Sequence, residues 1–459
     1  LRTWDWRCQA VVREDEVIAV HPLPGEGRMA PRPLPGLAVD VGSTSLAGYL
    51  VDLNTGTTLA AQGAMNPQIG YGEDIISRLV YARKTPDGAQ RLRRVVVDAL
   101  NDLIETLCAA AKVRRQDIVD AVIVGNTAMH HLLLGLPTEQ LAVAPFVPAV
   151  ADDLDLRARE VGLHLAPGAY LHILPNIAGF VGADHVAMLL ATEHEWQGRT
   201  AVALDIGTNT EISLVLPDGR IRTVSCASGP AFEGYHIRDG MRAQPGAVER
   251  VRIDGQGVHV QTIAAAAPVG ICGSGILDAV AQLYRAGILN EAGRMVPGAH
   301  PRVREQDGQR EFVLVEAAAD GSARPIGITQ HDVREIQLAK ASIQTGIALL
   351  LAEGGVAPEQ IERFIIAGAF GAYIDVANAV AIGMFPDLPL DRFRQVGNAA
   401  GIGAKLALLS THLRRRAREL RRRVAYLELA THPHFARLFA RSCRLRPFAG
   451  VGAPSFRRP

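Results

Sequence analysis

Two segments of the chain combine an aspartate, a glycine and hydroxyl or amide side chains in the same order. The first reads Asp40-Val-Gly-Ser-Thr, and the second, 165 residues later, reads Asp205-Ile-Gly-Thr-Asn. Apolar runs flank both segments, which is the pattern of a β-hairpin. In such a turn, glycine lets the backbone bend sharply, and successive N–H groups and hydroxyls can bind an anion. The pattern predicts two phosphate-binding turns, formed by Gly42, Ser43, Thr44, Gly207, Thr208 and Asn209.

The aspartate of each turn stands at the end of the first strand. A carboxylate at that point can hold a hydrated Mg²⁺ ion or orient water without touching the phosphates. We therefore predict Asp40 and Asp205 as metal ligands and catalytic residues. The alternative is that each aspartate caps its own turn, because Asp and Gly are common turn residues. Two copies in register favour loops that face each other across a cleft and bind one polyphosphate.

A third segment, Ile365-Ile-Ala-Gly-Ala-Phe-Gly, is an apolar strand that runs into a glycine-rich turn. In company with two phosphate turns it suits an adenosine site, formed by Gly368, Ala369 and Gly371; a close strand–helix crossing is the alternative. Gly273, Ser274 and Gly275 precede a helix whose free N–H groups could bind an anion, and an ordinary helix start explains them equally well. The chain lacks the P-loop and Rossmann glycine patterns.

Other polar residues have weaker assignments. Glu211 is predicted as a catalytic acid or base and Glu233 as a second candidate, so the catalytic base is open. His130 is interpreted as a core or interface histidine rather than a ligand contact, and Cys226 and Cys272 as packing residues. The segment 66–78 is either a partner-docking loop or an ordinary surface loop.

Strands that alternate with helices predict an α/β fold. Helices are expected over 73–82, 89–111, 178–191, 274–286 and 332–352. Because the two hairpins repeat, we expect two related lobes of about 165 residues each. The predicted segments are a hairpin and Pro-rich linker that end a preceding domain (1–36), lobe I (37–200), lobe II (201–410), and an Arg-rich amphipathic helix and tail that pack on the lobes (411–459).

Charge and cysteine content exclude several classes of protein. Residues 411–459 hold 13 Arg and two Glu, but the apolar residues recur at helical spacing, which favours a packing helix with a solvated Arg face over a nucleic-acid or membrane contact. Five scattered cysteines form no CxxC pair, which indicates no zinc or iron–sulfur framework in these residues and fits a reducing cytoplasm. No apolar run reaches the length of a membrane span.

Six longer strings together resemble the ATP-dependent reductive activators of corrinoid proteins, within the superfamily of acetate and sugar kinases, Hsp70 and actin. They are Asn66-Pro-Gln with Gly72-Glu-Asp-Ile-Ile-Ser-Arg, Gly125-Asn-Thr-Ala-Met-His-His-Leu-Leu-Leu-Gly, Ala203-Leu-Asp-Ile-Gly-Thr-Asn-Thr-Glu-Ile, Ala227-Ser-Gly-Pro-Ala-Phe-Glu-Gly, Gly270-Ile-Cys-Gly-Ser-Gly-Ile-Leu-Asp and Ile366-Ala-Gly-Ala-Phe-Gly-Ala-Tyr.

The resemblance implies two ribonuclease-H-like lobes with an ATP cleft between them. It also implies that ATP hydrolysis drives reduction of an inactive Co(II) corrinoid protein to Co(I) for methyl transfer. In such activators an N-terminal ferredoxin-like domain carries a 2Fe-2S cluster. The cluster is expected only in a missing N-terminal domain, because the start at Leu1 favours a trimmed chain over a relative without its own donor.

The sequence thus predicts a cytoplasmic ATPase that uses ATP and Mg²⁺. Its expected partners are a corrinoid protein of a methyltransferase system and an electron-donor domain or ferredoxin, without nucleic acid or membrane; a homodimer is left open. A small-molecule kinase of the same superfamily and a nucleotide-binding scaffold protein are the alternatives. Intact Asp40 and Asp205 argue against the scaffold, and the lack of a clear base for an acceptor hydroxyl argues against the kinase.

Overall fold

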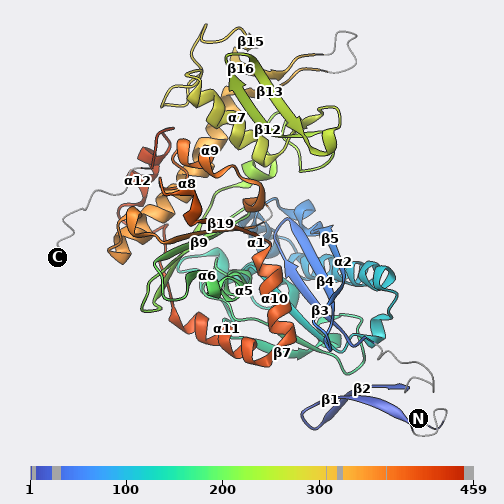
Figure 1. The fold of residues 1–459 in the computed structure, drawn as a ribbon. Coiled ribbons are helices and arrows are strands. Elements are labelled where there is room, and N and C mark those ends of the chain that lie inside the picture. Colours follow the sequence, from blue (N-terminus) through green and yellow to red (C-terminus); the bar gives the residue numbers. More distant parts are fainter. Residues whose placement is uncertain are drawn as a thin grey trace. The chain divides into compact units, whose positions relative to one another are not determined.

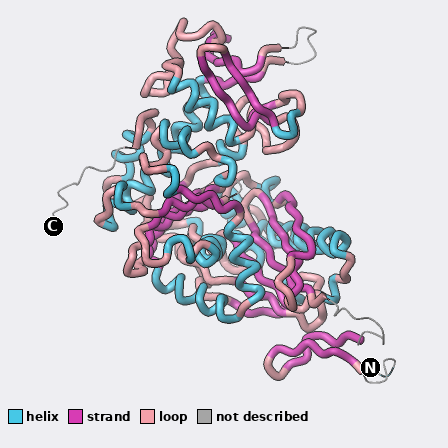
Figure 2. The backbone as a smooth tube through the Cα atoms, viewed as in Figure 1, coloured by secondary structure: helices cyan, strands magenta, loops and turns pink. Residues whose placement is uncertain are grey.

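The computed structural model describes residues 2, 7–22, 33–306, 308–317, 324–368 and 370–448 (Figures 1 and 2). The chain divides into two compact units. Unit 1 contains residues 1–194 and 398–424, and unit 2 contains residues 195–397 and 425–459. The predicted linker over 23–32 and the predicted adenosine residue Ala369 lie outside the described residues.

Unit 1 is built on a six-stranded sheet with the order β5-β4-β3-β6-β8-β7. Strands β3, β4 and β5 form an antiparallel meander, whereas β3, β6 and β8 run parallel. Parallel strands end at the same edge of a sheet, so Asp40 lies beside Val124 there. The strands are β3 (Pro35–Val41), β4 (Ser45–Asp52), β5 (Thr58–Met65), β6 (Asp120–Gly125), β7 (Leu154–Arg157) and β8 (Tyr170–Ile173).

Helices cover both faces of this sheet. A Cβ atom at Gly48 would touch Leu103 and Leu107 of α2, whereas the neighbouring Tyr49 lies against Gly401 of α10. Because successive strand residues point to opposite faces, α2 and α10 lie on opposite sides (Figure 1). The helices are α1 (Ile75–Lys84), α2 (Gly88–Ala111), α3 (Thr127–Leu134), α4 (Ala158–Val161), α5 (Ala183–Ala191), α10 (Ala399–Leu409) and α11 (Thr411–Arg423), and α6 (Glu193–Trp196) follows at the boundary.

The first described residues form a hairpin, β1 (Cys8–Arg13) and β2 (Glu16–Pro22), as the sequence predicts. It belongs to unit 1 and contacts the rest of that unit, and its role as the end of a preceding domain stays a prediction. Tyr170 Oη donates to Glu16 Oε2 over 2.9 Å, and the guanidinium of Arg13 lies 3.9 Å above the Tyr170 ring. Ile18 is buried. Tyr170 lies on β8, more than 130 residues along the chain from the hairpin, so no pattern within residues 1–36 indicates this contact.

The sheet of unit 2 repeats the topology of the unit 1 sheet in five of its strands, whereas its sixth strand lies at the opposite end. Its order is β19-β18-β9-β10-β11-β20, with an antiparallel β9–β10–β11 meander and β18 and β19 parallel to β9. Ala367 of β18 pairs with Asp205 as Val124 of β6 pairs with Asp40. The predicted duplication therefore extends beyond the hairpins to five strands of each sheet. The strands are β9 (Ala201–Ile206), β10 (Thr210–Val215), β11 (Ile221–Cys226), β18 (Arg363–Ala367), β19 (Phe393–Gly397) and β20 (Val424–Tyr426).

Between β11 and α8, unit 2 contains two small three-stranded sheets that the sequence analysis did not anticipate. Their orders are β13-β12-β14 and β15-β16-β17. The strands are β12 (Ala247–Asp254), β13 (Gly257–Thr262), β14 (Gly270–Ile271), β15 (Val303–Gln306), β16 (Gln309–Val315) and β17 (Ile326–Thr329). The helices of the unit are α7 (Gly273–Arg285), α8 (Gln330–Gly354), α9 (Val376–Ala381) and α12 (Phe435–Ser442).

The C-terminal segments differ from the predicted domain limits. Helix α10 was predicted within lobe II (201–410), but it belongs to unit 1 together with α11, whereas α12 belongs to unit 2. The predicted segment 411–459 is thus shared by the two units. The reason is packing: α10 lies against α5, β3 and β6.

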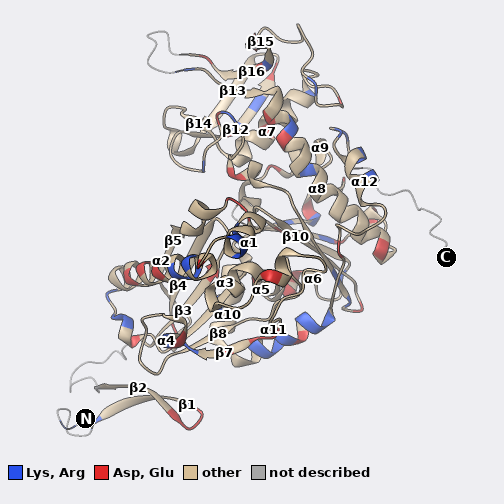
Figure 3. Ribbon diagram, turned by 180° about the vertical axis from the view of Figure 1, so that it is seen from behind, with Lys and Arg blue, Asp and Glu red and all other residues tan. Residues whose placement is uncertain are grey.

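Helix α11 is amphipathic as predicted, but its arginines are not all solvated. Arg414 is buried and pairs with Asp120, and Arg418 Nε lies 2.9 Å from Asp153 Oδ1. Arg416 bonds Glu193. Figure 3 shows the concentration of basic residues on this helix. Several arginines therefore fix α11 to unit 1. Among the described helices, none has the length and apolar character to span a membrane.

Candidate functional site

The turn between β3 and β4 is held by hydrogen bonds to its carbonyl groups. Gly42 N–H donates to Ser45 O over 2.9 Å, and a Cβ atom at Gly42 would lie 2.7 Å from that oxygen. Asn66 donates two hydrogen bonds to the turn. Its backbone N–H donates to Thr44 O (3.0 Å), and its Nδ2 donates to Gly42 O (2.9 Å). The turn that carries Ser43 and Thr44 therefore has a fixed conformation.

Asn66 itself is fully buried, and its Oδ1 accepts from the N–H of Gln68 over 3.0 Å. Arg78, at the other end of the same predicted loop, is also fully buried and donates through Nε to Gly72 O. Because both side chains are buried, Asn66 and Arg78 are neither part of an exposed docking surface nor ordinary surface-loop residues. Asn66 instead supports the β3–β4 turn, whereas Pro67, Gly70, Glu73, Asp74 and Ile76 of the segment are exposed, so partner docking by this segment stays a prediction.

We expect Asn66→Ala to raise the KM for ATP about tenfold. The change removes the donor to Gly42 O and the cap of Gln68, which are buried hydrogen bonds worth about 1–2 kcal/mol together. Steady-state ATP turnover measures the effect. The matched control is Asn54→Ala in the exposed turn after β4, and an equal rise in both variants would contradict the assignment.

Two further residues join Asp40 at the edge of the unit 1 sheet. Asp184 stands in the first turn of α5, and Asn398 is the N-cap of α10, where its Oδ1 accepts from Gly401 N–H over 2.7 Å. Burial and the charge of Asp184 raise the pKa of Asp40 to about 7, against the opposing effect of a hydrogen bond from Asn398. Burial raises the pKa of Asp184 to about 6.

Asp40 and Asp184 thus place two carboxylates with raised pKa values in one site. Magnesium is commonly held by one or two protein carboxylates, while waters and phosphates complete its coordination. The pair Asp40 and Asp184 therefore fits a hydrated Mg²⁺ ion, whose positive charge would favour the ionised form of both carboxylates and so oppose both pKa shifts. The sequence analysis named Asp40 and missed Asp184 and Asn398.

The turn between β9 and β10 in unit 2 is built in the same way. Gly207 N–H donates to Asn209 O over 3.0 Å. Ser228 Oγ lies 3.3 Å from Thr208 O and 3.4 Å from Gly207 O, and also 2.8 Å from Thr210 Oγ1. Ser228 thus supports this turn as Asn66 supports the other, and it belongs to the string Ala227-Ser-Gly-Pro-Ala-Phe-Glu-Gly.

Glu233 of the same string contacts the phosphate turn. Thr208 Oγ1 donates to Glu233 Oε1 over 2.6 Å, and Glu233 Oε2 is buried without a hydrogen-bond partner among the described residues. Left-handed Gly229 and Gly234 bound the short helix Pro230–Glu233 that carries it. The Glu233 carboxylate is therefore held in place through Oε1, and Oε2 is available to accept a proton.

Glu211, the first predicted acid or base, lies on β10 directly opposite Asp205 of β9. Its Oε1 accepts from Ser225 Oγ over 3.1 Å, and the side chain is buried. A hydrogen bond from Thr208 Oγ1 links Glu233 to the phosphate turn. Glu233 is accordingly the stronger candidate for the base, and Glu211 is better described as a neighbour of Asp205.

The predicted adenosine loop begins beside Asp205. Gly368 has φ +94°, and a Cβ atom there would lie 2.3 Å from Ile206 O and 3.0 Å from Asp205 Oδ1. Only glycine fits this position. Gly371 is also tightly placed, because a Cβ atom would lie 2.8 Å from Ile366. Adenosine binding by Gly368 and Gly371 stays a prediction.

The start of α7 is closely packed. A Cβ atom at Gly273 would lie 1.9 Å from Phe232 O, and one at Gly275 would lie 2.1 Å from Val248 O. Phe232 stacks on Phe370 of the adenosine loop with ring centroids 4.6 Å apart. Packing alone thus requires both glycines, and nucleotide binding by Gly273, Ser274 and Gly275 stays a prediction.

His130 is buried in unit 1, as expected for a core histidine. Its Nδ1 accepts from Asn176 Nδ2 over 2.9 Å, and burial lowers its pKa to about 3. It lines an apolar cavity of about 10 Å³. Cys226 is also buried, and burial raises the pKa of its thiol, which matches a packing residue.

Two family models match the chain, and each contains one of the two turns. The model described as the RACo middle region matches residues 35–196, which include Asp40. The model described as the C-terminal domain of RACo, the ASKHA domain, matches residues 199–449, which include Asp205. The chain belongs to the RACo family.

Relatives agree with this membership. The RACo-family chain is 37% identical over 416 residues to the corrinoid activation enzyme RamQ of Eubacterium limosum, covering 89% of this chain and 70% of that protein. It is 26% identical over 380 residues to the Co(II) methylated amine-specific corrinoid protein reductase of Methanosarcina barkeri, with coverages of 76% and 66%.

A solved structure of a reductive activator for corrinoid,iron-sulfur protein matches with a TM-score of 0.85 and 37% identity, covering 94% of this chain and 68% of that one. The RACo-family chain therefore has the predicted actin- and Hsp70-type fold. It spans about two thirds of the length of these three proteins.

Proposed function

We propose that this chain is the ATPase portion of a reductive activator of corrinoid proteins. It couples ATP hydrolysis to the one-electron reduction of a Co(II) corrinoid protein to Co(I). The observation that carries the proposal is that both RACo models match here, each around one intact Asp-Gly phosphate turn. The names of RamQ and of the corrinoid protein reductase support the same partner.

In this proposal the turn of unit 2 binds the phosphates of ATP through Gly207, Thr208 and Asn209. Asp205 and Glu233 orient the attacking water, and Glu233 Oε2 accepts its proton. Asp40 and Asp184 in unit 1 hold hydrated Mg²⁺, which supplies positive charge for the phosphates when bound. Ser43 and Thr44 bind phosphate in the first turn.

The proposed process couples two reactions, ATP hydrolysis and the reduction of cobalt, and each must balance in atoms and electrons. Water cleaves the terminal phosphoanhydride bond of ATP to give ADP and phosphate, and one electron converts Co(II) to Co(I). We propose that the electron comes from a 2Fe-2S donor, either a preceding domain or a separate ferredoxin, which is oxidised by one electron. Among the described residues no group of three His, Cys, Asp or Glu side chains could hold a metal ion.

Anaerobic reduction of a purified Co(II) corrinoid protein tests the proposal. With a reduced ferredoxin present, the cobalt absorbance should change to that of Co(I) with ATP, and not with ADP or a non-hydrolysable analogue. Reduction that does not depend on ATP, or no reduction with a donor known to be active, would overturn the assignment. Phosphorylation of an added sugar or acid in place of phosphate release would identify a kinase.

A further inference from the structure

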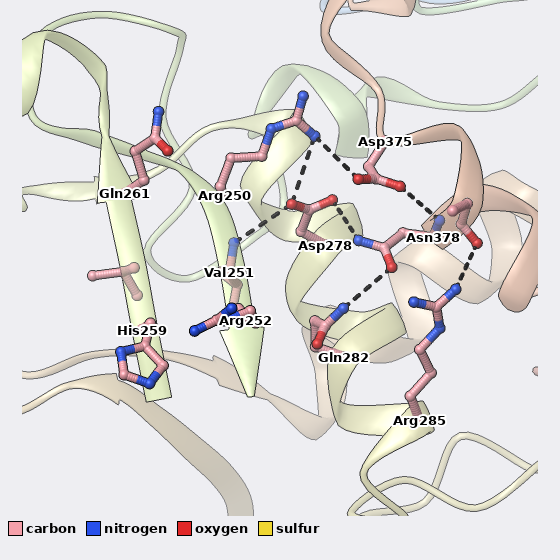
Figure 4. A pocket seen from close by; sticks show the side chains of 12 residues that line it. Arg250, Val251, Arg252, His259, Gln261, Asp278, Gln282, Arg285, Asp375 and Asn378 are labelled. Carbon is pink, nitrogen blue, oxygen red and sulfur yellow. Dashed lines mark hydrogen bonds and ion pairs between the residues drawn. The ribbon is translucent and has the colours of Figure 1, made fainter. Parts of the chain in front are cut away.

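A polar groove lies between the β12–β13 ribbon and helices α7 and α9 of unit 2 (Figure 4). Its volume is about 470 Å³, within the usual range of small-molecule sites. None of the lining residues belongs to the two phosphate turns or to the loop Gly368–Gly371. The first residue of α7 that lines it is Asp278, beyond the glycines at the helix start.

One wall of the groove is a ladder of polar side chains. In the antiparallel pair, Arg250 lies opposite Gln261 and Arg252 lies opposite His259. Cross-strand partners and alternate residues of one strand share a face of the ribbon, so these four side chains project together. Arg252 and His259 are solvent-exposed, and both pair with the exposed Asp254 at the ribbon tip.

The opposite wall is a fixed network between α7 and α9. Asn378 Nδ2 donates to Asp278 Oδ1 over 3.0 Å, and Gln282 Nε2 donates to Asn378 Oδ1 over 3.2 Å. Asp375 Oδ1 accepts from Asn378 N–H, and Arg285 Nη2 donates to Ala377 O over 3.0 Å. The side chains of this wall are thus held in place before any ligand binds, which lowers the entropic cost of binding.

The charges of the groove favour an anion. Three arginines and two aspartates line the groove, so the formal charge of its lining is positive, and both carboxylates already accept hydrogen bonds from N–H groups of the network. Arg250 Nη1 is buried without a hydrogen bond among the described residues, 3.7 Å from Asp278 Oδ2 and 3.9 Å from Asp375 Oδ2. A buried donor in this state is stabilised by a ligand oxygen.

We propose that this groove binds a small anion with two or more phosphate or carboxylate groups, separately from the nucleotide. Guanidinium groups match phosphate and carboxylate oxygens in geometry and charge. Arg250 and Arg252 contact the ligand from the ribbon, and Arg285 contacts it from α7. The site is independent of the proposed ATPase activity.

Calorimetric titration with pyrophosphate tests the groove, with a non-hydrolysable ATP analogue present at saturation to occupy the nucleotide site. The double variant Arg252→Gln/Arg285→Gln replaces one arginine in each wall of the groove. Both residues are solvent-exposed, so the variant should fold. The control Arg415→Gln/Arg422→Gln removes the same charge from exposed positions of α11. We expect about tenfold weaker binding in the first variant and a change below about twofold in the control.

Three outcomes overturn the proposal. They are absence of pyrophosphate binding to the wild-type protein, equal weakening in both double variants, and displacement of pyrophosphate by the ATP analogue. Equal weakening would indicate general attraction to positive charge, and displacement would place the anion in the nucleotide site. A carboxylate probe, citrate, distinguishes the two ligand chemistries by relative affinity.

Discussion

Glu233→Gln is expected to lower kcat for ATP hydrolysis by about 100- to 10,000-fold, the usual contribution of a positioned acid or base. The amide keeps the size of the side chain and still accepts from Thr208 Oγ1, so the turn should retain its shape. It cannot accept a proton at the position of the unpartnered Oε2. We therefore expect little change in the KM for ATP, and steady-state phosphate release gives both constants.

Glu211→Gln is the matched control for this prediction. Glu211 is a buried glutamate of the same lobe whose Oε1 accepts from Ser225 Oγ. Its kcat should stay within about threefold of wild type if Glu233 is the base, far below the loss expected for removal of a base. A large loss in Glu211→Gln with near-normal turnover in Glu233→Gln would reverse the assignment.

The parts of the site that the sequence predicted are local ones. A turn that carries Asp, Gly and hydroxyl residues between two apolar strands is encoded within about ten positions, so both turns could be located without a structure. Their repetition also predicted two similar sheets, because a repeated hairpin implies a repeated unit around it. The same local pattern placed Gly368 at a strand end, where β18 runs beside Asp205.

The missing parts depend on contacts between distant segments. Asp184 and Asn398 both stand at helix starts, where Asp and Asn are also ordinary capping residues. Only the fold brings them to the edge of the sheet that carries Asp40. Before α5, the N–H groups of Ile177 and Ala178 donate to Val181 O in a turn, and the N-cap Gly182 has extended backbone angles. The helix therefore begins at Ala183 and not at 178 as predicted.

Arginine-rich α11 shows the same limit for charge patterns. Helical periodicity correctly gave one apolar stripe, but it assigned Arg414 to the solvated face. The fold supplies Asp120 as its partner, and a paired guanidinium can be buried where an unpaired one cannot. The periodicity of apolar residues shows which face of a helix can pack against the protein. It contains no information on the charged residues of the surface against which the helix packs.

Asp40→Asn is expected to reduce kcat/KM for Mg·ATP by about 100-fold or more and to stabilise the metal-free protein at pH 8. The activity loss follows from removing one of two carboxylates that hold Mg²⁺. The gain in stability follows from the pKa of Asp40, which burial and Asp184 raise to about 7. An unfolded aspartate titrates near pH 3.9.

Between these two values the folded protein binds more protons than the unfolded chain. The free energy of unfolding of the metal-free protein therefore falls as the pH rises from about 4 to about 7. At pH 8 the carboxylate of Asp40 is ionised in a buried site beside Asp184, and asparagine removes that charge. At pH 5 Asp40 is already mostly protonated, so the substitution should have little effect on stability.

Thermal unfolding in EDTA measures this dependence. We expect the Tm of Asp40→Asn to exceed that of wild type by about 2–4 °C at pH 8 and to match it at pH 5. Adding Mg²⁺ at pH 8 should raise the Tm of the wild type and not that of the variant. Asp102→Asn, at an exposed position of α2, is the control and should change neither quantity. A variant that loses both activity and stability at pH 8 would show that Asp40 has a structural role, because a carboxylate whose pKa is raised in the folded state destabilises the metal-free protein when it is ionised.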